Sequence, residues 1–140
     1  MSDRPKGLID TGAILALVDR SDRWHRRCVE AFSTLRLPLA TSAAILTELF
    51  HLLETPQEVD AAWGFLGSGA VTVLPVDDAD LPDVQALMRR YGDRPMDFAD
   101  ATLVHLARRE GLVTIFTVDH NDFETYRIEG KRRFRIVPDR

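Results

Sequence analysis

The chain has 140 residues, 45% hydrophobic and 29% charged, which suits one folded domain with a single core. A net charge of −4 argues against a simple basic nucleic-acid-binding module, although an acidic metal site can coexist with local arginines. The single cysteine, Cys28, excludes an internal disulfide and a paired-cysteine zinc site, and it suits a reducing cytoplasm. The apolar run after the polar N-terminus is interrupted by Asp10, so we expect no signal peptide.

Short β-like runs alternate with helical runs along the chain. We expect strands at residues 7–10, 39–41, 71–74, 113–118 and 134–137. We expect helices at residues 13–18, 24–35, 43–53, 56–66, 80–91 and 97–110. This alternation predicts an α/β fold with a mostly parallel central sheet flanked by helices, covering residues 1–140 as one domain. In such sheets, ligands bind beyond the carboxyl ends of the strands.

Two aspartates follow predicted strands directly. Asp10 ends the first strand, and Asp119 lies at the carboxyl end of the strand 113–118. Either side chain could instead bond nearby backbone amides in a turn, which is common for Asp after a strand. Asp122 has the character of a turn or short-helix cap residue.

Glu48 interrupts a helix whose other residues are largely apolar, so we expect that helix to be buried. Because Glu is almost never buried unpaired, it needs a cation, a proton or an arginine partner. Taken alone, a solvated or arginine-paired Glu48 at the edge of the core is the favoured interpretation. His51, one turn later, could approach the same pocket, but packing in the core is the favoured interpretation.

Asp97 and Asp100 open the helix 97–110. Asp97 suits the N-cap, and Asp100 in the first turn suits the helix dipole. The two acids share a stripe with Ala101 and Val104, so a stripe that faces the core would direct Asp100 toward the strand ends. We therefore expect a capping role for Asp97 and a functional role for Asp100.

The joint pattern is more informative than any one acid. Two acids at strand ends and two on inward helix faces could converge on one pocket of a parallel sheet. Carboxylates packed together raise one another's pKa, and a divalent cation relieves their repulsion. Ligands that are all oxygen favour Mg²⁺ or Mn²⁺ over zinc. No nucleophilic triad is evident, so a metal-bound water is the candidate nucleophile.

Four segments, in this order, resemble the acidic motifs of PIN domains. They are Leu8-Ile9-Asp10-Thr11-Gly12-Ala13-Ile14, Thr47-Glu48-Leu49, Met96-Asp97-Phe98-Ala99-Asp100-Ala101, and Thr117-Val118-Asp119 followed by Asp122-Phe123. The resemblance spans residues 8–123 and implies a parallel sheet with a pocket for one or two Mg²⁺ or Mn²⁺ ions. It implies that the acidic quartet of catalytic metal ligands is Asp10, Glu48, Asp100 and Asp119. Asp97 matches an extra acid found in a subset of the family, and Thr11 and Thr117 match positions that orient the acids.

The compact chain is similar to VapC-type toxins of bacterial toxin–antitoxin pairs. That resemblance implies a cytoplasmic endoribonuclease with three partners: substrate RNA, a cognate antitoxin and a second copy of the chain. An antitoxin arginine could enter the acidic pocket and pair with its carboxylates. Candidate partner surfaces include Trp24, Phe32, Trp63 and Phe65, with core packing as the favoured interpretation for most of them. The arginine-rich segments 20–27 and 131–135 could hold the RNA backbone or could be ordinary solvated surface.

Other functions fit parts of the pattern. A PIN-fold RNA-processing nuclease without a toxin role and a metal-dependent phosphatase of small molecules both stay open. A phospho-receiver switch fits poorly, because Asp10 has no acidic neighbour and Asp60 falls inside a helix. A catalytically silent PIN fold is disfavoured because the acidic quartet is complete.

Overall fold

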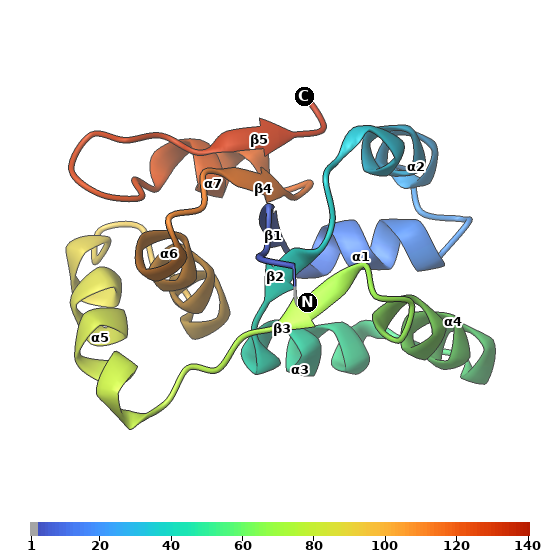
Figure 1. Cartoon of the computed structure of the whole chain (residues 1–140), viewed down its shortest axis with the longest axis horizontal. Helices are drawn as coiled ribbons and strands as arrows, with labels where there is room; N and C mark the ends of the chain where they lie inside the picture. The colour runs from blue at the N-terminus through green and yellow to red at the C-terminus, as the bar shows by residue number, and fades with distance from the viewer. Residues whose placement is uncertain (1–2) are drawn as a thin grey trace.

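Five parallel strands form one sheet at the centre of the molecule (Figure 1). The computed structural model describes residues 3–140. The strands are β1 (Gly7–Ile9), β2 (Leu39–Thr41), β3 (Val71–Val73), β4 (Thr114–Phe116) and β5 (Arg135–Val137). Their order across the sheet is β3-β2-β1-β4-β5. The α/β fold class predicted from the sequence is therefore confirmed.

Helices cover both faces of this sheet. They are α1 (Thr11–Val18), α2 (His25–Thr34), α3 (Ala43–Leu52), α4 (Pro56–Leu66), α5 (Leu81–Arg90), α6 (Phe98–Glu110) and α7 (His120–Thr125), with a 3₁₀ turn η1 (Asp78–Asp80) before α5. In Figure 1, α1, α2 and α4 lie to the right of the sheet, whereas α5, α6 and α7 lie to its left. Helix α3 contacts both α1 and α6, so it joins the two sides below β2.

The strand order places a switch point between β1 and β4. From β1 the chain proceeds outward to β2 and β3, and it then returns to lay β4 on the other side of β1. The connections on the two sides diverge there, which opens a crevice at the carboxyl ends of β1 and β4. The backbone N–H of Asp10, just after β1, donates to the carbonyl of Phe116 at 3.0 Å, so the two strand ends lie side by side.

Local sequence signals set most helix starts. Ser42 and Thr55 cap α3 and α4 by accepting hydrogen bonds from Ile45 N–H and Glu58 N–H. Helix α6 contacts β1 and α3, and its residues 99–107 are all buried. The helix that carries Asp100 is thus held in the core on nearly all its faces.

The structure differs from the expectations in two helices. Helix α3 buries only one side, represented by Ile45 and Leu49, while Leu52 is 50% exposed. The expectation of a fully buried helix was wrong, because its apolar residues also form part of the molecular surface. Helix α7 was not predicted, because its sequence, His-Asn-Asp-Phe-Glu-Thr, is mostly polar and only six residues long. Within residues 3–140, no helix is both long enough and apolar enough to cross a membrane.

Gly111 ends α6 in a left-handed conformation, with φ of +69°, that a side chain disfavours. We expect Gly111→Ala to lower the free energy of unfolding by about 1 kcal/mol. Gly64 is the matched control, because it is exposed inside α4 and an added Cβ would meet no atom within 4 Å. Gly64→Ala should raise the free energy of unfolding by about 0.5–1 kcal/mol. Urea denaturation measures both, and equal effects of the two substitutions would contradict this account of the α6 terminus.

Candidate metal centre

A cavity of about 430 Å³ lies at the carboxyl ends of β1 and β4. All five acids singled out in the sequence line it, although they come from four separate segments. The lining residues are Asp10, Thr11, Gly12, Glu48, His51, Leu52, Asp97, Asp100, Val118, Asp119 and Asp122. The fold therefore brings the acids at the strand ends and those on the inward helix faces together in one cavity, as expected from the sequence.

Asp10 is fixed from both sides at the end of β1. One carboxylate oxygen accepts from Thr11 N–H at 2.8 Å, which caps α1, and the other accepts from the Thr117 hydroxyl at 2.8 Å. The same Thr117 oxygen accepts from Asp119 N–H at 3.0 Å, so one hydroxyl links the segments after β1 and β4. Asp10 is only 6% exposed, and burial raises its pKa to about 6 despite these hydrogen bonds.

Glu48 enters the cavity from α3. Its carboxylate accepts from the Thr11 hydroxyl at 2.9 Å, and within residues 3–140 no arginine or lysine forms an ion pair with it. Partial burial raises the pKa of Glu48, and the negative charge of Asp97 raises it further. His51, one turn later, is exposed and lines the cavity, so the expectation that it packs in the core was wrong.

Asp97 and Asp100 approach from the start of α6. Asp97 accepts from Asp100 N–H at 2.8 Å, which confirms the predicted N-cap, and its side chain also lines the cavity. Asp100 is 8% exposed. Burial, followed by the charges of Asp10 and Asp97, raises its pKa to about 8. At neutral pH the metal-free protein therefore tends to hold a proton on Asp100.

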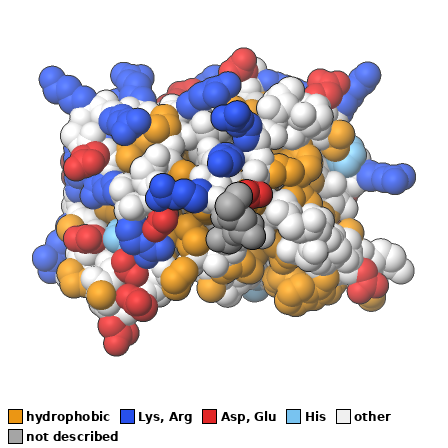
Figure 2. All heavy atoms as spheres, in the orientation of Figure 1, with side chains coloured by type: hydrophobic (Ala, Val, Ile, Leu, Met, Phe, Trp, Pro, Cys, Tyr) orange, Lys and Arg blue, Asp and Glu red, His pale blue; other side chains and the backbone are white. Residues whose placement is uncertain are grey.

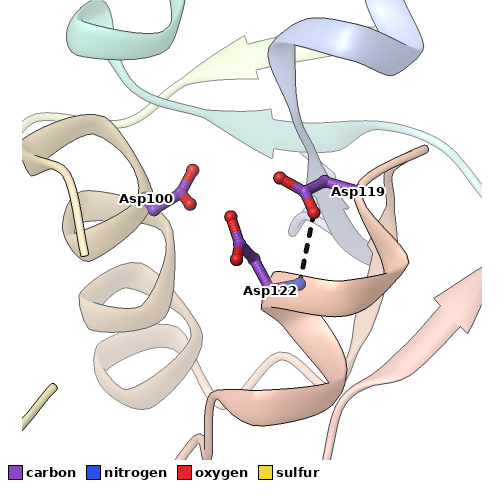
Figure 3. Close-up of side chains that lie close together, drawn as sticks. All are labelled: Asp100, Asp119 and Asp122. Carbon is purple, nitrogen blue, oxygen red and sulfur yellow. Dashed lines mark hydrogen bonds between the residues drawn. The ribbon is translucent and has the colours of Figure 1, made fainter. Parts of the chain in front are cut away.

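Three carboxylates lie especially close together. Side-chain oxygens of Asp100, Asp119 and Asp122 all fall within 4.8 Å of one another, and they point into a shared space in Figure 3. Asp119 caps α7 by accepting from Asp122 N–H at 3.2 Å, so Asp119 is the cap and the cap expectation for Asp122 was wrong. Asp122 instead occupies the first turn of α7, where partial burial and Asp119 raise its pKa. A residue three positions after an N-cap lies on the same side of the helix as the cap. This spacing would have placed Asp122 beside Asp119 if α7 had been predicted.

Sequence reasoning also missed two residues that touch these acids. Tyr126 is fully buried and donates from its hydroxyl to Asp100 at 3.0 Å, with the rings of Tyr91 and Phe123 packed against its own. Arg94, in the loop before α6, forms an ion pair with Asp122 at 3.0 Å. Neither residue carries a local sequence signal, because both contacts join segments more than 25 residues apart.

The donor set of the cavity fits a hard divalent cation. Six carboxyl groups and the Thr11 hydroxyl line the cavity with oxygen, and His51 is the one nitrogen donor among the lining residues, which do not include Cys28. Such oxygen donors suit Mg²⁺ and Mn²⁺ and do not favour zinc. Burial and the charges of neighbouring acids raise the pKa of Asp10, Glu48 and Asp100, and within residues 3–140 none of these three acids forms an ion pair with an arginine or a lysine. A bound divalent cation would offset the negative charge of these acids and so remove the free-energy penalty of ionising them in the cavity.

The fold and its cavity define a small α/β protein with a carboxylate-lined site at the switch point of a parallel sheet. A PIN domain family model matches residues 7–129. Ribonuclease VapC26 of Mycobacterium tuberculosis (strain ATCC 25618 / H37Rv) is 31% identical over 134 residues, which cover 94% of this chain and 99% of that protein. This chain therefore belongs to the PIN domain family.

A solved structure supports the same fold. The crystal structure of Mycobacterium tuberculosis VapC20, described as a sarcin-ricin loop cleaving toxin, aligns with a TM-score of 0.71 at 23% sequence identity. The alignment covers 81% of this chain and 90% of VapC20. At this identity the likeness concerns the fold alone.

The raised pKa of Asp100 gives the metal-free protein a defined pH dependence. The unfolded chain loses this proton near pH 3.8, whereas the folded protein keeps it until about pH 8. The folded state thus binds the extra proton, and its stability falls as the pH rises across that window. We expect Asp100→Asn to flatten the fall in melting temperature between pH 5 and pH 8, measured calorimetrically in EDTA.

The control is Asp60→Asn, which changes an exposed aspartate of α4 and should follow the wild-type curve. Parallel curves for Asp100→Asn and the wild type would show that Asp100 is not held protonated in the folded state.

Proposed function

We propose that this chain is a Mg²⁺- or Mn²⁺-dependent endoribonuclease and the toxin of a VapBC-type toxin–antitoxin pair, acting in the cytoplasm as one PIN domain of residues 1–140. The observation that carries the proposal is the convergence of the predicted acids in one cavity at the switch point. Family membership and the relative named as a ribonuclease support the same activity. They favour it over a phosphatase of small molecules.

The proposed catalytic metal ligands are Asp10, Glu48, Asp100 and Asp119, with Asp97 and Asp122 as further carboxylates at the same cavity. A bound cation would make a water molecule more acidic and would offset the negative charge that develops on the phosphate oxygens. The chain's own residues set the geometry of the donors. Thr117 and Thr11 hold Asp10 and Glu48 by hydrogen bonds of 2.8 and 2.9 Å. Tyr126 holds one oxygen of Asp100, which leaves the other free to face the cavity.

The proposed antitoxin would meet an apolar surface beside the cavity. Leu52 lines the cavity and is half exposed, and Phe50 on the same helix stacks against Trp63 of α4 with ring centres 4.8 Å apart. Trp63 is 60% exposed, whereas Trp24, Phe32 and Phe65 pack against the core. A partner helix on this surface could extend an arginine into the acidic cavity, where charge-assisted pairing favours it. A second copy of the chain is the other protein partner that we propose.

Purified protein should cleave RNA with Mg²⁺ or Mn²⁺ and lose that activity in EDTA, because the carboxylates alone provide no nucleophile. Asp10→Asn and Asp100→Asn should each lower the cleavage rate by about 10²-fold or more, since neutral amides bind such cations poorly. Asp97→Asn should be milder, because Asn still caps the helix. Gel assays on labelled RNA measure these rates, with a small phosphate ester as the control substrate.

Undiminished RNA cleavage in EDTA would reject the metal-dependent mechanism. Faster turnover of the small ester than of RNA would favour the phosphatase instead. An inactive Asp97→Asn beside an active Asp100→Asn would reverse the roles assigned to these two acids.

Expression of the chain alone should stop bacterial growth, and co-expression of the adjacent small gene should restore it. The reason is that an unrestrained ribonuclease damages its host's RNA. Growth curves with inducible expression test this, and Asp10→Asn serves as the inactive control. Normal growth after expression in the native host lacking the neighbouring gene would reject the toxin role while leaving the nuclease activity in place.

A further inference from the structure

The acidic cavity presents an electrostatic problem for its proposed substrate. Each RNA phosphate is negative, and the cavity is lined by six carboxyl side chains. On the face drawn in Figure 2, Lys and Arg side chains are spread widely, with Asp and Glu among them, rather than gathered into one basic patch. Because phosphate and carboxylate groups repel each other, a cation at the edge of the cavity would matter for how the RNA backbone approaches.

Arg94 provides a cation at that edge. It lies in the loop between α5 and α6, three residues before Asp97. One guanidinium nitrogen is 3.0 Å from a carboxylate oxygen of Asp122, and another donates to the Thr125 hydroxyl at 2.9 Å. Among the ion pairs formed within residues 3–140, this is the one that joins an arginine to an acid of the cavity.

The stability of the fold does not explain this pair. The Arg94 side chain is 50% exposed, and exposed ion pairs contribute little to folding. The two contacts do, however, orient the guanidinium plane while leaving further N–H donors unused. A guanidinium group held in this way can bind a phosphate by donating two parallel, charge-assisted hydrogen bonds to its oxygens.

We propose that Arg94 is an RNA-binding residue that holds a backbone phosphate at the edge of the cavity, with Asp122 and Thr125 orienting its guanidinium. The proposal rests on the proposed nuclease function, since it assigns part of the substrate-binding surface of the same site. Arg94 positions the RNA and does not take part in the bond-breaking step. Its loss therefore acts mainly on KM and on RNA affinity.

The test measures RNA binding separately from cleavage. Fluorescence anisotropy with a short labelled single-stranded RNA in Mg²⁺, on an Asp10→Asn background, gives the affinity at several salt concentrations. Arg94→Ala should weaken binding by about tenfold. It should also reduce the slope of log affinity against log salt by about 0.7, the value for one phosphate contact on a single strand. Arg94→Lys keeps the charge, so the slope should persist while part of the affinity is lost.

Two controls separate contact with phosphate from general charge effects. Arg89→Ala removes the same charge from an exposed position on α5 and should leave the slope unchanged. The double variant Arg94→Ala/Asp122→Asn removes the arginine together with the acid it pairs with. If Arg94 only neutralised Asp122, the double variant would regain normal affinity. If Arg94 binds phosphate, RNA binding by the double variant stays weak.

Steady-state kinetics in the otherwise wild-type protein complete the test. Arg94→Ala should raise KM by about tenfold with kcat within about threefold of wild type. An unchanged salt slope, or recovery of affinity in the double variant, would overturn the proposal and leave the nuclease function intact. Absence of RNA cleavage by the wild-type protein would instead reject the proposed function. Melting temperatures show whether each variant is folded. If Arg94→Ala is not, Arg94→Gln replaces it, because glutamine also lacks the charge but keeps a polar side chain, and the same loss of affinity and salt slope is expected.

Discussion

The burial of carboxyl groups close to one another, at the carboxyl ends of β1 and β4, is the constraint on which the rest of the structure depends. Asp10 and Asp100 are both nearly buried, and burial raises the pKa of each carboxyl. A chain without a use for this site would lower its free energy by replacing such acids with apolar residues. The fold instead holds them with hydroxyl donors, namely Thr117 on Asp10 and Tyr126 on Asp100. These hydroxyl groups fix the orientation of the carboxyl groups but supply no positive charge. In the metal-free protein the raised pKa of Asp100 favours a bound proton there, and a divalent cation would take over that role.

The parallel sheet explains why acids so distant in the sequence meet. Because β4 returns to the side of β1 opposite β2, the segments after β1 and β4 are neighbours, and Thr117 connects them directly. Helix α6 supplies Asp100 from a position buried on nearly all its faces, so that side chain cannot retreat into solvent. The same features that stabilise the scaffold thus concentrate negative charge. Any cation that binds only the folded protein also stabilises it.

The parts of the site that follow local rules could be predicted from the sequence. Asp10 and Asp119 follow β-like runs, and the Asp97 cap follows the ordinary preference for Asp at a helix start. Glu48 needed the family resemblance, since its own helix favoured a solvated or arginine-paired acid at the edge of the core. Contacts between distant segments could not be predicted. The short polar helix α7, which brings Asp122 into the cavity, has no apolar periodicity to mark it.

One electrostatic demand connects catalysis, substrate binding and regulation in the functions proposed here. A divalent cation, the guanidinium of Arg94 and an arginine from a partner all supply positive charge to the same group of carboxylates. Arg94 pairs with Asp122 and not with the buried acids Asp10 and Asp100, which would therefore stay available to the proposed metal. A partner's arginine would have to reach those inner acids to compete with the metal, and it would thereby stabilise the fold while blocking activity. Inhibition and stabilisation by an antitoxin would then share a single physical cause.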